Sequence, residues 1–122
     1  MSLTDEERKV IVNLEIEKSE KTFQEFDVLY KMELWNSAAN RLYYSLNVKS
    51  HRGVMALFGQ YYIKSGIFER EDGRLFSDLV IMRDNADYNC FYEADEAKLS
   101  PFVTPTHQLI ERIKRYIEDK RA

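Results

Sequence analysis

The sequence predicts an all-α protein, an antiparallel bundle of four main helices with a short extra turn or helix between the second and the third. Only four glycines and two prolines interrupt its 122 residues. Apolar residues recur at helical spacing, and no stretch shows the alternation typical of strands. With 44% hydrophobic and 32% charged residues, the composition suits a helix-rich globular chain. We expect residues 1–122 to form a single domain, because this length suffices for one core.

The first helix is expected to begin after Thr4, whose hydroxyl can cap it, with acidic residues 5–7 near the positive end of the helix dipole. Its apolar residues do not fall on one clean stripe, so the pattern does not define its buried face. No glycine or proline precedes Gly53. We therefore expect Asn36 and Ser37 to supply the cap that separates the first helix from the second.

The second helix is expected over residues 37–58 and carries two distinct faces. The core face consists of Ala39, Leu42, Tyr43, Leu46, Ser50, Gly53, Val54 and Leu57. A neighbouring stripe consists of Asn40, Tyr44, Asn47, His51 and Phe58. Amides, a phenol and an imidazole in register indicate either a binding site or a polar interface with another helix or subunit.

A third helix is expected from residue 72 or 73 to residue 89, with Leu75, Leu79, Met82 and Ala86 on its core side. Residues 91–99 are acidic and are expected to be loosely structured at first. The last helix has two candidate starts, Ser100-Pro101 and Thr104-Pro105, each a cap residue followed by proline. A helix that began at residue 101 would be kinked at Pro105. Its inward face consists of Leu109, Ile113, Tyr116 and Ile117.

Charge is unevenly distributed in this chain of formal net charge −3. Residues 34–68 contain no aspartate or glutamate but include Arg41 and His51, so this basic segment could attract a phosphate or an acidic partner, or simply form a solvated helix face. Cys90 is the only cysteine. No apolar run is long enough to span a bilayer, so we expect a cytoplasmic protein without membrane association. No spacing of cysteine and histidine predicts a metal site, and we expect no cofactor.

Residues 83–88, which read RDNADY, contain the candidate ligand-binding residues of the third helix. The guanidinium of Arg83 offers a fixed fork of donors that suits anionic oxygens. Asp84 directly follows Arg83. Asp87 lies four residues after Arg83, so the two side chains can instead form an ion pair within the helix. Tyr88 lies about 140° round the helix from Arg83, so we do not expect both to point at one ligand unless the helix frays or a second subunit completes the site.

Three segments together, 39–44, 49–54 and 83–88, read ANRLYY, KSHRGV and RDNADY. With these motifs the chain resembles the HEPN domain family, in the branch whose third helix ends in Arg-x-x-Ala-Asp-Tyr. The resemblance spans nearly the whole chain. It implies a HEPN-like bundle that often forms a homodimer, with Arg83 near a cleft between subunits. Many relatives are paired with small nucleotidyltransferases in toxin-antitoxin systems.

The resemblance also implies a departure from the catalytic members, which cleave RNA without a metal. In those enzymes the arginine is followed by a polar residue and then by a histidine. Arg83 and Asp84 match the opening, but Tyr88 stands where the histidine is first expected. A tyrosine phenol has an ordinary pKa of about 10 and is poorly suited to act as a base near neutral pH. The catalytic residues are therefore left unassigned.

Three functions follow from these observations. The preferred one is a module that binds a nucleotide, an RNA phosphate or a nucleotidyltransferase partner, through Arg83, Asp84, Asp87 and Tyr88 together with the stripe Asn40, Tyr44, Asn47 and His51. The second is a metal-independent ribonuclease in which His51 or Tyr88 takes the place of the usual histidine. The third is a structural partner in a helical complex.

Overall fold

The computed structural model describes residues 4–46 and 69–121. These residues form four helices and no strand: α1 (Asp5–Lys31), α2 (Trp35–Leu46), α4 (Arg70–Tyr88) and α5 (Glu96–Arg121). The all-α class predicted from the sequence is confirmed. The expected extra turn or helix and the second half of the expected second helix fall in residues 47–68, outside the described residues.

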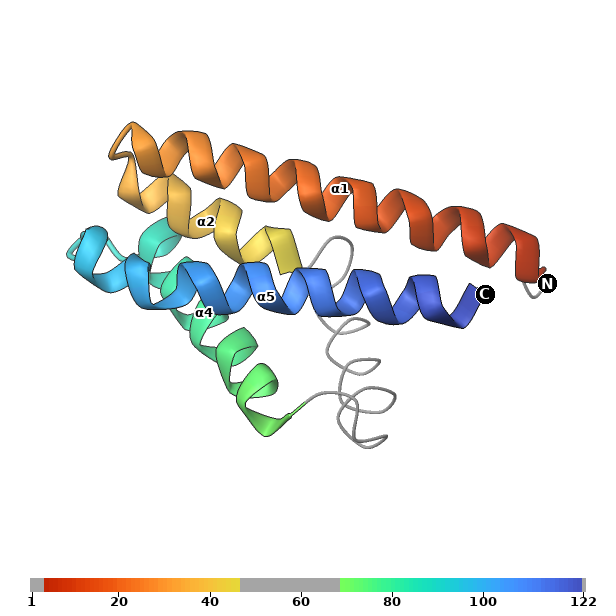
Figure 1. Cartoon of the computed structure of the whole chain (residues 1–122). Coiled ribbons are helices and arrows are strands. Elements are labelled where there is room, and N and C mark those ends of the chain that lie inside the picture. Colours follow the sequence, from red (N-terminus) through yellow and green to blue (C-terminus); the bar gives the residue numbers. More distant parts are fainter. Residues whose placement is uncertain (1–3, 47–68, 122) are drawn as a thin grey trace.

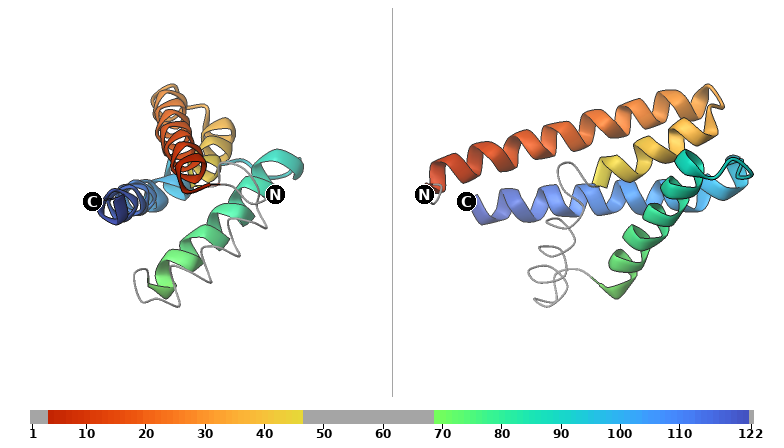
Figure 2. Two further views of the ribbon diagram at one scale, coloured as in Figure 1. Left: turned by 90° about the vertical axis from the view of Figure 1, so that its right-hand side faces the viewer. Right: turned by 180° about the vertical axis from the view of Figure 1, so that it is seen from behind.

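Helices α1, α2 and α5 lie side by side, with α1 running opposite to α2 and α5 (Figure 1). Helix α4 crosses this group at a steep angle, as the two further views show (Figure 2). Its C-terminal end meets the end of the bundle where α1 turns into α2, and α5 begins at this same end. The last turn of α4 and the first turns of α2 are thereby brought together.

The turn between α1 and α2 contains the single described non-glycine residue with positive φ, Glu33 at 61°. Its neighbour Leu34 donates a backbone hydrogen bond to the carbonyl of Leu29 at 3.0 Å. Helices commonly end with a residue in the left-handed conformation, followed by a backbone hydrogen bond that spans five residues. Glycine normally takes the left-handed position, which Glu33 occupies here. At the other end of α1, the Thr4 hydroxyl accepts from the amide of Glu7 at 3.1 Å, as the sequence predicted.

Helix α2 begins at Trp35, earlier than expected, so Asn36 and Ser37 lie inside the helix and do not cap it. The Asn36 side chain instead accepts a hydrogen bond from the amide of Ala94 at 2.8 Å, which ties α2 to the segment before α5. Helix α4 also begins earlier than expected. Glu69 and Asp72 form a reciprocal capping box at its start, which satisfies backbone donors that an uncapped helix leaves free.

Helix α5 begins at Glu96, so neither proline-containing start predicted from the sequence is correct, and residues 96–99 are helical rather than loose. Asp95 is the effective cap, because its carboxylate accepts from the amide of Lys98 at 2.8 Å. Pro101 and Pro105 therefore lie inside the helix. None of the helices in the described ranges is both long and apolar enough to span a membrane.

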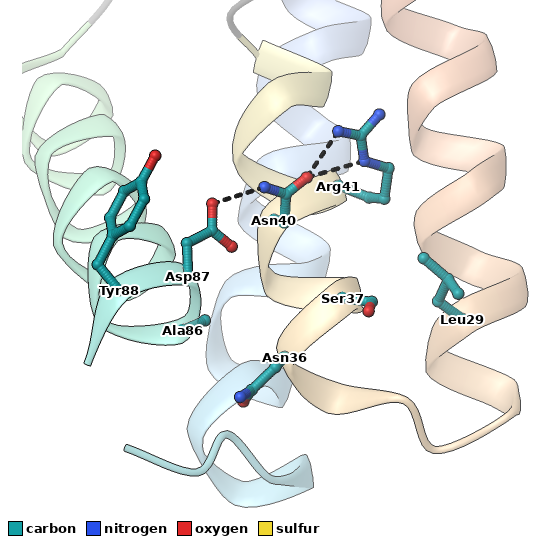
Figure 3. Close-up of a pocket in the computed structure, with 8 residues that line it drawn as sticks. All are labelled: Leu29, Asn36, Ser37, Asn40, Arg41, Ala86, Asp87 and Tyr88. Atoms are coloured by element: carbon teal, nitrogen blue, oxygen red, sulfur yellow. Dashed lines mark hydrogen bonds between the residues drawn. The ribbon is translucent and has the colours of Figure 1, made fainter. Parts of the chain in front are cut away.

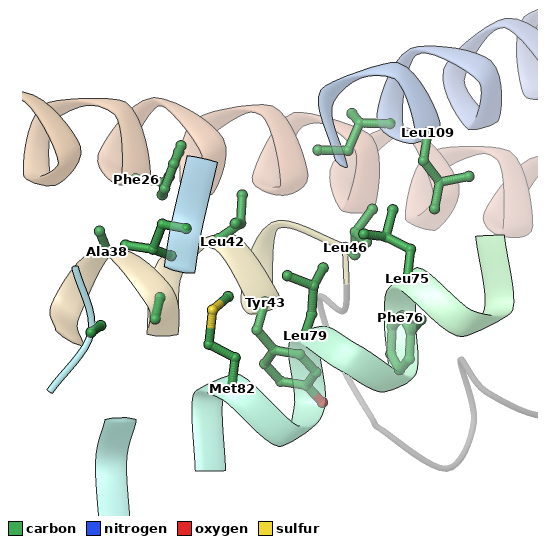
Figure 4. Packing of buried hydrophobic residues seen from close by; sticks show 14 residues of the cluster. Phe26, Ala38, Leu42, Tyr43, Leu46, Leu75, Phe76, Leu79, Met82 and Leu109 are labelled. Atoms are coloured by element: carbon green, nitrogen blue, oxygen red, sulfur yellow. The ribbon is translucent and has the colours of Figure 1, made fainter. Parts of the chain in front are cut away.

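The core lies where α2 and α4 meet α1 and α5 (Figure 4). The fully buried side chains include Phe26, Leu42, Tyr43, Leu79 and Leu109. The predicted core positions Ala39 and Leu46 of α2 and Leu75 and Met82 of α4 are buried as well. On α1, Phe26 is 1% exposed whereas Val10 and Leu14 are 57% and 58% exposed. Among the side chains whose burial the structure describes, the buried apolar one of α1 lies in its C-terminal half. This agrees with the unclear stripe in its sequence.

Candidate functional site

Arg83 occupies the face of α4 that packs against α2. One terminal nitrogen of its guanidinium donates to Asp84 at 2.8 Å, and the other donates to the Tyr44 hydroxyl at 2.7 Å. Its Nε lies 3.1 Å from the Asp87 carboxylate, close enough for an ion pair, although the N–H is not aligned for a hydrogen bond. The side chain is 14% exposed. An incoming phosphate would have to displace the Asp84 contact to reach the guanidinium.

Three tyrosine rings surround the same guanidinium. Its central carbon lies 5.6, 5.2 and 5.4 Å from the ring centroids of Tyr43, Tyr44 and Tyr88. A cation over aromatic faces is stabilised by the ring quadrupoles. Burial by itself lowers the pKa of Arg83, but the hydrogen bond with Asp84 and the neighbouring phenols and carboxylate raise it, and the result is a pKa above the ordinary value. Arg83 is therefore a fixed, permanently charged centre.

Tyr88 and Arg83 converge, contrary to the geometric expectation from the sequence. The helix continues as far as Tyr88, and Asn89 is its cap. The Tyr88 hydroxyl nevertheless lies 3.4 Å from a terminal nitrogen of Arg83. Two long side chains span the angle between their positions on the helix, so neither fraying nor a second subunit is needed. The Tyr88 residue is 75% exposed, which excludes a place in the core.

A chain of polar contacts links α4 to α2 and α1. The amide nitrogen of Asn40 donates to Asp87 Oδ2 at 2.9 Å. The amide oxygen of Asn40 accepts twice from Arg41, at 3.0 Å from Nε and 2.6 Å from a terminal nitrogen. Arg41 in turn lies 3.5 Å from the carboxylate of Glu25 on α1. Each amide atom of Asn40 thus has a defined partner, and its orientation is fixed.

These residues border an open pocket of about 660 Å³ at the end of the bundle (Figure 3). Figure 3 shows Asp87 between Tyr88 and Asn40, with Arg41 reaching toward α1. The lining residues are Leu29, Asn36, Ser37, Asn40, Arg41, Ala86, Asp87 and Tyr88. A pocket of this size is within the range that holds a small ligand. Arg83 does not line the pocket but contacts Asp87 and Tyr88, which do.

The structure brings together six of the eight candidate residues: Arg83, Asp84, Asp87, Tyr88, Asn40 and Tyr44. Asn47 and His51 lie outside the described residues. The pattern missed Arg41 and Glu25, because an arginine on one helix and a glutamate on another become a pair only once α1 and α2 pack together. Within the described part of the chain, no group of three or more histidine, cysteine or acidic residues could hold a metal ion.

The chain is similar to a UPF0332 protein of Thermotoga maritima, with 25% identity over 130 residues that cover 95% of this chain and 98% of the relative. It is also similar to two proteins of Methanocaldococcus jannaschii named "Putative toxin MJ0142" and "Putative toxin MJ0605". The match to the first is 26% identical and covers 86% of this chain and 80% of the relative. The match to the second is also 26% identical and covers 85% of this chain and 87% of the relative. The chain has toxin-like relatives. No protein-family model matches it.

Proposed function

We propose that this chain is a HEPN-type module of a toxin-antitoxin pair, and that it binds RNA or a nucleotide at the pocket beside Arg83. One observation carries the proposal: a part-buried, permanently charged arginine holds an exposed tyrosine and a carboxylate at the rim of an open pocket. Exposed aromatic rings next to cationic side chains are the usual elements of sites for single-stranded nucleic acid. The toxin-like relatives support the same assignment.

Binding is preferred over cleavage because of the groups that surround Arg83. Among the described residues these are phenols and carboxylates, and no imidazole lies within the contacts of the guanidinium. The ribonuclease alternative therefore depends on His51, outside the described residues. It requires that RNA cleavage by the purified protein vanish in both Arg83→Ala and His51→Ala.

The proposal includes a homodimer and a small nucleotidyltransferase partner, which the sequence resemblance implies. It also includes a cytoplasmic location, which is the expectation from the single cysteine and the lack of a long apolar run. A purely structural partner protein is the competing assignment. That assignment needs no ligand in the pocket, whereas the binding assignment requires that a ligand stabilise the folded protein.

The test measures binding of the full chain to a short, fluorescently labelled single-stranded RNA of mixed sequence. Fluorescence anisotropy reports the binding, and the melting temperature reports its effect on stability. We expect the RNA to bind and to raise the melting temperature. Arg83→Ala should weaken binding about tenfold or more, since it removes the cation that holds Tyr88 and Asp87. Arg74→Ala is the matched control, because Arg74 is an exposed arginine on the same helix outside the pocket. Equal binding by both variants, or no binding by the wild-type chain, would contradict the proposal.

A further inference from the structure

We infer that the pocket receives an unpaired base with an exocyclic amino group, adenine or cytosine, and does not receive a phosphate. The base stacks on the Tyr88 ring and donates its amino hydrogen to Asp87 Oδ1. This inference rests on the proposed RNA or nucleotide binding and names the part of the ligand that the pocket recognises.

Asp87 leaves one oxygen of its carboxylate available to a ligand. Its Oδ2 accepts from Asn40 at 2.9 Å and lies 3.1 Å from Nε of Arg83. No described residue donates a hydrogen bond to Oδ1. The side chain is 24% exposed, and Asp87 lines the pocket. A carboxylate held by two partners through one oxygen therefore presents its other oxygen as a fixed acceptor.

The charged side chains beside the pocket do not favour a phosphate. Two guanidinium groups, Arg83 and Arg41, lie in contact with three carboxylates, those of Asp84, Asp87 and Glu25. The cluster is formally negative by one charge, and its cations already have anionic partners. A phosphate placed in the pocket would meet the available oxygen of Asp87 and be repelled. The pocket instead demands a ligand that donates hydrogen bonds.

The ring of Tyr88 forms the aromatic wall of the pocket. Tyr88 is 75% exposed, and the Arg83 guanidinium lies 5.4 Å from its ring centroid. The cation fixes the ring in place while leaving most of its surface open. Stacking of a base on such a ring is favourable for every base, so it provides affinity without choosing among them.

Asp87 then determines which base the pocket prefers. Carboxylates accept from the amino groups of cytosine and adenine, whereas uracil presents carbonyl oxygens at the corresponding edge. Guanine offers two adjacent donors, which pair best with both oxygens of one carboxylate, but Asn40 already occupies Oδ2. The arrangement therefore favours adenine and cytosine over uracil.

The test compares binding of short oligoadenylate, oligocytidylate and oligouridylate RNAs of equal length to the full chain by fluorescence anisotropy. We expect adenine and cytosine oligomers to bind about tenfold more tightly than uracil oligomers. Asp87→Asn, which is isosteric, should remove most of this preference, because an amide can donate to the uracil carbonyl. Asp78→Asn, on the same helix but outside the pocket, should retain the preference.

Two further variants test the aromatic wall. Tyr88→Ala should weaken binding of all three oligomers by a similar factor, about tenfold, since it removes the stacking surface. Phe91→Ala removes an aromatic side chain that is 94% exposed but does not line the pocket, and it should bind as the wild type does.

The outcomes separate this inference from the proposed function. RNA binding that depends on Arg83 but is equal for the three oligomers overturns the base preference and leaves RNA binding intact. Binding of inorganic phosphate or pyrophosphate that competes with RNA at the pocket overturns the exclusion of phosphate. If no RNA binds and a lysine-rich peptide binds through Asp87 instead, both the base preference and the proposed RNA binding are overturned.

Discussion

Arg112 of α5 and Asp72 of α4 form a paired contact, with two hydrogen bonds of 2.6 and 3.0 Å between guanidinium and carboxylate. The Asp72 side chain is 8% exposed, and the same carboxylate accepts from the backbone amide of Glu69 at 3.0 Å. One aspartate thus caps the start of α4 and anchors it to α5. The far end of this helix carries Asp87 and Tyr88, so the clamp helps to set where the pocket wall lies.

Asp72→Ala should lower the free energy of unfolding by about 2 kcal/mol, because it removes a helix cap and a largely buried partner of Arg112. Urea denaturation monitored by circular dichroism measures the change. Asp78→Ala, on the same helix, is the control and should change stability by less than about 0.5 kcal/mol. Equal stability of the two variants would show that the clamp contributes nothing.

Glu33→Gly should stabilise the protein by about 0.5 kcal/mol. Glu33 has a φ of 61°, which costs an L-residue energy, and glycine adopts this conformation freely at some entropic cost in the unfolded chain. Glu33→Ala separates the two effects, since it removes the carboxylate but retains the β-carbon. Thermal and urea unfolding should therefore show a gain for glycine alone, and a gain of the same size for alanine would assign the effect to charge.

Tyr44→Phe should destabilise the protein by about 1 kcal/mol, because it leaves a part-buried N–H of Arg83 without the acceptor that lies 2.7 Å away. Tyr88→Phe is a matched comparison. Its hydroxyl lies 3.4 Å from the same nitrogen in an exposed position, so its loss should have little effect on unfolding. The reverse order of effects would mean that Arg83 depends on Tyr88 rather than on Tyr44.

Stability should decline at alkaline pH partly through Tyr92. Burial, followed by the negative charge of Asp95, raises the pKa of Tyr92 above the ordinary value of 10.0. The folded state therefore holds this proton more tightly than the unfolded state. The associated stability is complete below pH 10 and is lost as the pH rises through the folded-state pKa. Urea unfolding across this range should show a shallower decline for Tyr92→Phe than for the wild type.

A residual decline should remain in Tyr92→Phe, because burial and Glu96 also raise the pKa of Tyr30. The double variant with Tyr30→Phe should flatten the profile further. An unchanged slope in the double variant would assign the alkaline decline to other groups.

Sequence patterns predicted helix caps and buried positions well where they depend on residues of the same helix. The Thr4 cap is confirmed, because capping depends on neighbours in sequence. Helical periodicity correctly predicted the buried positions Ala39, Leu42, Tyr43 and Leu46 of α2 and Leu75, Leu79 and Met82 of α4. Ala86, also expected on the core side, is only partly buried and lines the pocket. The predicted start of α5 was wrong because a cap residue followed by proline is a strong start signal, whereas Asp95 caps the helix upstream of both prolines. Leu99 is fully buried there, and its packing favours extending the helix beyond the prolines toward the N-terminus.

The candidate site was predictable in part. The spacing of Asn40 and Tyr44 placed them on one stripe of α2, and the structure sets that stripe against Asp87 and Arg83 of α4. The pairing of Arg41 with Glu25 depends on how α2 packs against α1, and the contact between Arg83 and Tyr88, which are both on α4, depends on the reach of the two side chains. Neither quantity is encoded in residue spacing.

The two prolines inside α5 have a consequence for how this helix opens. Neither has an amide hydrogen, so the carbonyls of Ala97 and Pro101 lack the donor that an uninterrupted helix would provide. Two backbone hydrogen bonds, about one helical turn apart, are therefore missing in the first half of a 26-residue helix. Amide protons in the first turns of α5 should therefore exchange with deuterium sooner than those around Leu109, which makes this segment an early point of local unfolding.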